Sequence, residues 1–156
     1  MTARQRIEQL TNTWYGFTVF AALAAVLEAA LWPFAPGLLF SPVKLLLAFV
    51  GSGVAVLFAI LLNVVGAVIG LAIVTFLGRT LLARSAAMRL ALVVASPIFA
   101  VFAALSSIKQ LWTGVSQFSP APLLAGVVSA IAVTLYLRSF RVLTDPAVKG
   151  YTGAAA

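Results

Sequence analysis

Glu28 is the residue whose type and position most directly suggest chemistry in this chain of 156 residues. It is the only acidic side chain within an apolar stretch, where a carboxylate is costly unless it is paired, protonated or functional. At helical spacing it shares a face with Ala21, Ala24 and Ala25, a small-residue surface suited to close helix contact. We therefore expect Glu28 to face protein rather than lipid.

Two lysines are the expected partners of Glu28. Lys44 and Lys109 are the only basic residues predicted on the outer side of the membrane, and both should lie at a height similar to that of Glu28. We predict an outer cluster of these three residues, which serves either as a helix-orienting salt bridge or as a proton- or cation-coupled site. The remaining alternative is exposure of Glu28 to the outer lipid headgroups.

A second polar side chain, Asn63, lies near the middle of a long apolar stretch. An unpaired amide is costly in lipid, so we expect Asn63 to face another helix. Small residues recur around it at helical spacing and end in a G-x-x-x-G motif; the candidate packing residues are Gly51, Ala55, Ala59, Gly66 and Gly70. The pattern predicts close helix packing, either within one chain or between copies, and the lining of an aqueous path is a third alternative.

The chain offers little that an enzyme requires. It has no cysteine and no histidine, which excludes disulfides, thiolate nucleophiles and histidine-bound metals. Two S-x-x-K spacings, at 41–44 and 106–109, lack the further motifs that accompany this pattern in acyl-transfer enzymes. The other two acids, Glu8 and Asp145, are predicted on the far side of the membrane from Glu28. We therefore predict no catalytic residue, no cofactor and no metal site.

The elements that must position these residues are predicted to be membrane helices. Hydrophobic residues make up 63% of the chain and charged residues 8%, against roughly 45–50% and about 25% in soluble globular proteins. Four apolar stretches predict helices over about 14–32, 43–78, 90–108 and 121–138. The predicted fold is an all-α integral membrane protein, a four-transmembrane-helix bundle over residues 14–141.

The second apolar stretch is unusually long. Residues 45–77 carry no charge, and as one straight helix they would span about 50 Å against a hydrocarbon core of about 30 Å. We predict one long or kinked helix, because no Pro-Gly or polar cluster marks a turn near Asn63. Ser41 and Pro42 predict its start, as N-cap and first helical residue. The alternative is two short helices folded back at Asn63, which would make five crossings and place the N-terminus outside.

The distribution of charge predicts the orientation. The net charge is +7, and four crossings place most basic residues on the side of the two termini: Arg4, Arg6, Arg79, Arg84, Arg89, Arg138, Arg141 and Lys149. Because such loops stay cytoplasmic, we predict a multi-pass protein of the cell inner (plasma) membrane with both termini cytoplasmic. Residues 1–13 are expected as an amphipathic lead-in on the cytoplasmic surface and residues 142–156 as a cytoplasmic tail.

Three of these arginines also form a candidate site for lipid. Arg79, Arg84 and Arg89 lie together in the sequence at the inner membrane boundary, where basic residues attract anionic headgroups. The cytoplasmic orientation of this loop already explains why these three arginines lie there. It also explains the positive charge without nucleic acid, which we do not expect as a partner.

We expect the chain to act through helix association, as a homo-oligomer or as an accessory, structural subunit of a membrane complex. It has almost no mass outside the predicted helices, and these are rich in glycine, alanine and serine at contact spacing. One alternative is a small transporter or channel that uses Glu28. A lone acid in the first helix of a small four-helix protein resembles the small multidrug transporters in outline, and no residue is carried over from them. The other alternative is a lipid-binding membrane protein.

Overall fold

The computed structural model describes residues 2–31 and 42–153, and every element in these ranges is a helix. The helices are α1 (Ala3–Leu31), α2 (Pro42–Leu82), α3 (Ala86–Ser116), α4 (Pro120–Thr144) and the short α5 (Pro146–Gly153). Within the described residues, four helices are long and apolar enough to cross a membrane. The predicted all-α class with four candidate membrane helices is therefore confirmed.

The long apolar stretch forms one helix. α2 runs for 41 residues from Pro42 to Leu82, which corresponds to about 62 Å. It begins at the proline expected in its first turn, and it passes Asn63 without a break. Ser41, the expected N-cap, lies outside the described residues. The fold-back at Asn63 that would have given five crossings is absent from the described helix.

The helices extend beyond the apolar stretches that predicted them. α1 begins at Ala3, so residues 3–13 are its first three turns and continue directly into the apolar part. α3 extends at both ends relative to 90–108, and α4 continues to Thr144. Hydrophobicity marks only the part of a helix that lipid would surround, whereas flanking Arg, Gln and Ala residues form helix equally well. Asp145 and Pro146 then begin α5, in which the Ala147 N–H donates to Asp145 Oδ1 at 2.9 Å.

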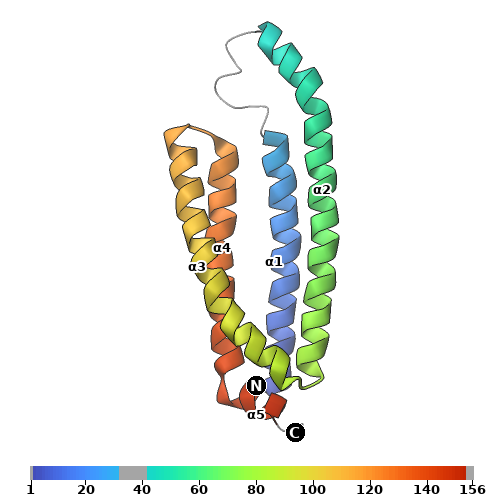
Figure 1. Cartoon of the computed structure of the whole chain (residues 1–156), viewed down its shortest axis with the longest axis vertical. Coiled ribbons are helices and arrows are strands. Elements are labelled where there is room, and N and C mark those ends of the chain that lie inside the picture. The colour runs from blue at the N-terminus through green and yellow to red at the C-terminus, as the bar shows by residue number, and fades with distance from the viewer. Residues whose placement is uncertain (1, 32–41, 154–156) are drawn as a thin grey trace.

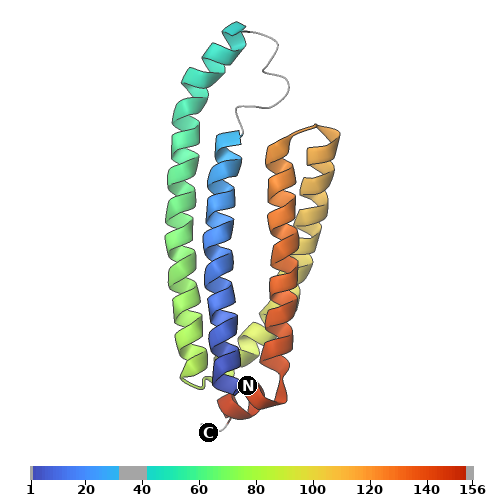
Figure 2. The same ribbon diagram turned by 180° about the vertical axis from the view of Figure 1, so that it is seen from behind.

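The four long helices form two hairpins that lie side by side (Figures 1 and 2). α1 packs against both α2 and α4, and α3 packs against α4, whereas α2 and α3 touch little. Both described ends of the chain lie at the same end of the molecule, beside α5 (Figure 1). We call this the terminal end, and the opposite end, which contains the turn between α3 and α4, the distal end.

The buried core lies at the terminal end. Its members come from α1, α2, α4 and α5, and they are Ile7, Leu10, Trp14, Leu81, Leu135, Leu143 and Val148. Residues of the first turns of α3 pack against the same cluster. The segment expected as a lead-in over residues 1–13 therefore supplies two core side chains, because α1 continues through it.

Polar contacts join the same elements around this core. Trp14 Nε1 donates to Ser139 Oγ at 2.8 Å, which connects α1 to α4. The Tyr151 hydroxyl of α5 donates to the Leu82 carbonyl at 3.0 Å, and Arg6 forms an ion pair with Asp145. Because buried donors are costly without partners, these bonds fix which helix faces meet at the terminal end.

Each of the two tight turns contains one residue in the left-handed region. After α2, the Ser85 N–H donates to the Thr80 carbonyl and Arg84 has φ 63°. After α3, the Ser119 N–H donates to the Gly114 carbonyl and Phe118 has φ 49°. Both are Schellman-type helix ends, in which glycine usually occupies the left-handed position.

Candidate functional site

Glu28 lies on α1 in its distal part and is half-buried. The two ion pairs among the described side chains, Arg4 with Glu8 and Arg6 with Asp145, both lie at the terminal end. Glu28 makes no hydrogen bond or ion pair with another described side chain. Its role as a proton- or cation-coupled site stays a prediction.

The pairing of α1 with α2 determines what lies level with Glu28. Contacts of Gly78 with Thr11 and of Gly70 with Thr18 define an antiparallel register. Continued along the helices, this register places Glu28 level with about residue 60 of α2, and Lys44 is roughly four turns further along. The side chain of Lys44 lies outside the described residues.

Lys109 does not approach Glu28 either. It is exposed on α3, a helix that packs against α4 rather than against α1. Figures 1 and 2 show α3 apart from α1 in the distal half of the molecule. The arrangement of the helices therefore does not gather Glu28, Lys44 and Lys109 into one cluster. Lys44 lies at another height along α2, and Lys109 lies on a helix that does not pack against α1.

Asn63 lies at the contact between α1 and α2. Its Nδ2 donates to the Ala25 carbonyl of α1 at 3.4 Å, which is long for a hydrogen bond. Tyr15 and Thr75 make a second, shorter bond between the same helices, 2.6 Å between the two hydroxyl oxygens. Asn63 and Thr75 of α2 thus face its hairpin partner.

The small residues of α2 do not form a single contact surface. A Cβ at Gly70 would lie 3.1 Å from Thr18 Cγ2 of α1, whereas a Cβ at Gly66 would meet nothing within 4 Å. Ala55 is exposed and Ala59 is half-buried, and the surroundings of Gly51 lie outside the described side chains. Gly70 thus serves packing within the chain, and Gly66 is open.

The most extensive helix packing lies between α3 and α4, where the sequence predicted no packing residue. A Cβ on Gly114 would lie 2.6 Å from Leu123 Cγ, and a Cβ on Gly126 would lie 2.7 Å from Leu111 Cγ. Ser107 Oγ also donates to the Gly126 carbonyl at 2.9 Å. A signal was available in the sequence, because Ala100, Ser107 and Gly114 recur every seven residues and are all buried.

The three arginines expected to bind headgroups have different surroundings. Arg84 stacks over the Tyr151 ring, 5.0 Å from its centroid, and Arg89 Nη1 donates to the Leu143 carbonyl at 3.3 Å. The Nε of Arg89 is buried with no partner among the described residues. Arg79 is exposed beside a separate cavity between α1 and α2. Two of the three therefore hold the C-terminal helices in place.

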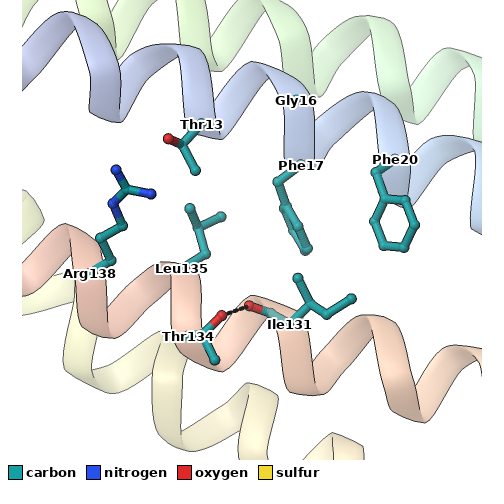
Figure 3. Close-up of a pocket in the computed structure, with 8 residues that line it drawn as sticks. All are labelled: Thr13, Gly16, Phe17, Phe20, Ile131, Thr134, Leu135 and Arg138. Atoms are coloured by element: carbon teal, nitrogen blue, oxygen red, sulfur yellow. Dashed lines mark hydrogen bonds between the residues drawn. The ribbon is translucent and has the colours of Figure 1, made fainter.

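A groove between α1 and α4 was not expected from the sequence. Its volume is about 550 Å³, and it is lined by Thr13, Gly16, Phe17, Phe20, Ile131, Thr134, Leu135 and Arg138. Figure 3 shows Arg138 and Thr13 at one end and the aromatic and aliphatic side chains toward the other. The groove is apolar along most of its length and has one cationic end.

Two further observations bear on chemistry. No group of three or more acidic, histidine or cysteine side chains that could hold a metal ion occurs within the part of the chain that the structure describes. Comparison of the chain with protein-family models, with curated proteins and with solved structures finds no match.

Proposed function

We propose that this chain acts through association in the membrane, with α2 as the contact helix and a second copy of the chain as the partner. The observation that carries the proposal is the position of α2. It packs against α1 on one side only, and by the register of the two helices it continues roughly four turns past the end of α1 (Figure 1).

Exposure of apolar side chains does not by itself require a partner, because lipid tails cover them equally well. The length of α2 is the stronger argument. To bury its 33 uncharged residues in a hydrocarbon core of about 30 Å, α2 would need a tilt of about 53°. Membrane helices tilt by roughly 0–40°, and α2 runs beside α1 and would tilt the whole hairpin. Contact with another protein is the alternative way to cover the apolar surface of α2 that the hydrocarbon core cannot bury.

Gly66 is a position of α2 at which a partner helix could approach closely. It is exposed, and its missing side chain leaves open space beside the backbone. Two copies inserted with the same topology would be related by a two-fold axis along the membrane normal, so that α2 of one copy meets α2 of the other. Small residues permit this close approach of backbones, which van der Waals contact then stabilises.

The same proposal includes an orientation. Most of the basic residues lie in the parts of the helices and turns at the terminal end, whereas Lys44 and Lys109 do not. Short segments rich in Lys and Arg stay in the cytoplasm. We propose that this end faces the cytoplasm in the inner (plasma) membrane. The bilayer itself is then a partner, and an accessory role in a larger membrane complex is a further outcome of the same association.

The mass of the detergent-solubilised protein tests the proposal. Gly66→Ile should shift the mass from that of an oligomer toward that of the monomer, because its new side chain occupies the space that the partner needs. Ala72→Ile is the matched control, since Ala72 is also exposed on α2 but lies on another face. Light scattering corrected for bound detergent measures the mass of each variant.

Two outcomes would contradict the proposal: a monomeric wild-type protein, or an oligomer that Gly66→Ile leaves unchanged. Gly70→Ile distinguishes an effect on association from an effect on the stability of the single chain. Because a Cβ added at Gly70 would lie only 3.1 Å from Thr18 Cγ2, this variant should lower the stability of the single chain. It should do so even in detergent that dissociates the oligomer.

A further inference from the structure

The groove between α1 and α4 has the layout of a lipid binding site. Along α4, Ile131 lies seven residues from Arg138, which places the apolar part of the groove about 10 Å from the cationic end. Arg138 belongs to the terminal end, where the basic residues gather, and the apolar part extends toward the middle of the helices (Figure 3). An anionic headgroup and its acyl chain are arranged in the same order across one leaflet.

The cationic end has no acidic partner among the residues that the structure describes. Arg138 is exposed and makes no ion pair with a described residue. Arg141 follows three residues later on the same helical face and is also exposed. Guanidinium groups bind phosphate oxygens through planar, charge-assisted hydrogen bonds, so two of them at one membrane boundary favour a phosphate.

The apolar part of the groove depends on Gly16. A Cβ at this position would meet nothing within 4 Å, so the missing side chain leaves the wall open between Thr13 and Phe20. Phe17, Phe20 and Ile131 line the space beyond it. The hydroxyls of Thr13 and Thr134 donate to carbonyls of their own helices, which leaves the lining without a free donor except at Arg138.

We propose that this groove binds an anionic phospholipid, with the phosphate at Arg138 and an acyl chain along Phe17, Phe20 and Ile131. A second copy of the chain does not supply the anion. The sequence has only three acidic residues, and two of them are engaged in ion pairs with Arg4 and Arg6. The site lies on α1 and α4, so it does not depend on self-association through α2.

Lipid retention by the full chain tests the proposal. Protein purified in mild detergent is incubated with phosphatidylglycerol or phosphatidylcholine, and bound lipid is counted by native mass spectrometry. The wild-type protein should retain phosphatidylglycerol in preference to phosphatidylcholine. Arg138→Gln should reduce this preference about tenfold, which is the usual contribution of a hydrogen bond to a charged group. Lys149→Gln, another exposed cation of the terminal end, should leave the preference unchanged.

Filling the groove tests the acyl-chain part separately. Gly16→Leu should abolish retention of phosphatidylglycerol, and Gly53→Leu is the matched control, because a Cβ at Gly53 also meets nothing within 4 Å. Ile131→Trp fills the groove from its other wall and keeps the test decisive if Gly16→Leu fails to fold. Normal retention in both groove-filling variants would overturn the proposal.

Other occupants give different results. Equal retention of both lipids by every variant would mean that no headgroup is recognised. Displacement of the lipid by inorganic phosphate alone would reduce the site to an anion site. A loss of oligomeric mass in Gly16→Leu would assign the groove to a protein helix. Each of these results overturns the lipid site, whereas loss of the oligomer in Gly66→Ile with normal lipid retention would leave it intact.

Discussion

The terminal and distal ends of the molecule are built in different ways. At the terminal end all five helices meet around large aliphatic side chains, and Ile7, Leu81 and Val148 are fully buried. At the distal end the α1–α2 hairpin stands apart from the α3–α4 hairpin, and each is held by small residues (Figures 1 and 2). The large buried apolar side chains are thus gathered at one end, and the helices are joined by smaller side chains toward the other.

The membrane placement that we propose accounts for this contrast. Near the membrane surface, helices can gain from the burial of large apolar side chains, as in a soluble protein. Within the hydrocarbon, lipid is as apolar as leucine, so helices associate through close backbone approach and interhelical hydrogen bonds. Ser107 and Gly126, which lie within the predicted membrane segments, provide both between α3 and α4.

The largest effect that tests this contrast is expected from truncation of the core. Leu81→Ala should lower the free energy of unfolding by about 2–5 kcal/mol, because the buried side chain is 0% exposed and leaves a cavity. Leu61→Ala on the same helix is the control. Leu61 is 58% exposed, and its truncation should change the free energy by less than about 0.5 kcal/mol. Unfolding in mixed micelles with increasing SDS measures both variants, and equal losses would refute the contrast.

An intermediate effect is expected at the glycine contact of the distal half. Gly126→Ala should cost about 1–3 kcal/mol, because its Cβ would lie 2.7 Å from Leu111 Cγ and 3.0 Å from the Leu111 nitrogen. Gly53→Ala, at an open position of α2, should be neutral or stabilising by up to about 1 kcal/mol. The same SDS titration distinguishes them. A stable Gly126→Ala protein would mean that α3 and α4 separate easily.

The smallest change in the free energy of unfolding is expected at the two turns, one at each end of the molecule. Phe118→Gly should raise the free energy of unfolding by about 1 kcal/mol, since glycine adopts a φ of 49° without the steric cost of a side chain. Phe118 is 86% exposed, so little contact is lost. Arg84→Gly relieves a similar strain but loses the stacking on Tyr151, and the two effects should nearly cancel. Phe118→Ala is the control and should give no gain, because alanine keeps the strain.

Composition and patterning predicted the helices well and their arrangement poorly. The start at Pro42, the continuity of α2 and the four apolar helices follow from residues close together in the sequence. The packing of α1 against both α2 and α4 does not follow from neighbouring residues, because four apolar helices can be ordered in several ways around a bundle. The glycine contacts were therefore predicted on α2, whereas α3 and α4 pack most extensively and approach each other closely at Gly114 and Gly126.

The candidate sites show the same limit. Glu28 and Lys44 were placed together from their expected side of the membrane, but height depends on the register of α1 against α2, which Thr11, Thr18 and the facing glycines set. The groove at Arg138 was not predicted, because one wall comes from each hairpin and its space depends on the absent side chain of Gly16. Such a feature arises only when two distant segments meet.

The position of α5 has a consequence for biosynthesis. Val148 and Thr152 are fully buried against the other helices, so the core cannot close before α5 has been made. Each hairpin can enter the bilayer as soon as its own two helices have emerged from the ribosome. We therefore expect both hairpins to insert before the core forms, and the core to form only once α5 has been synthesised.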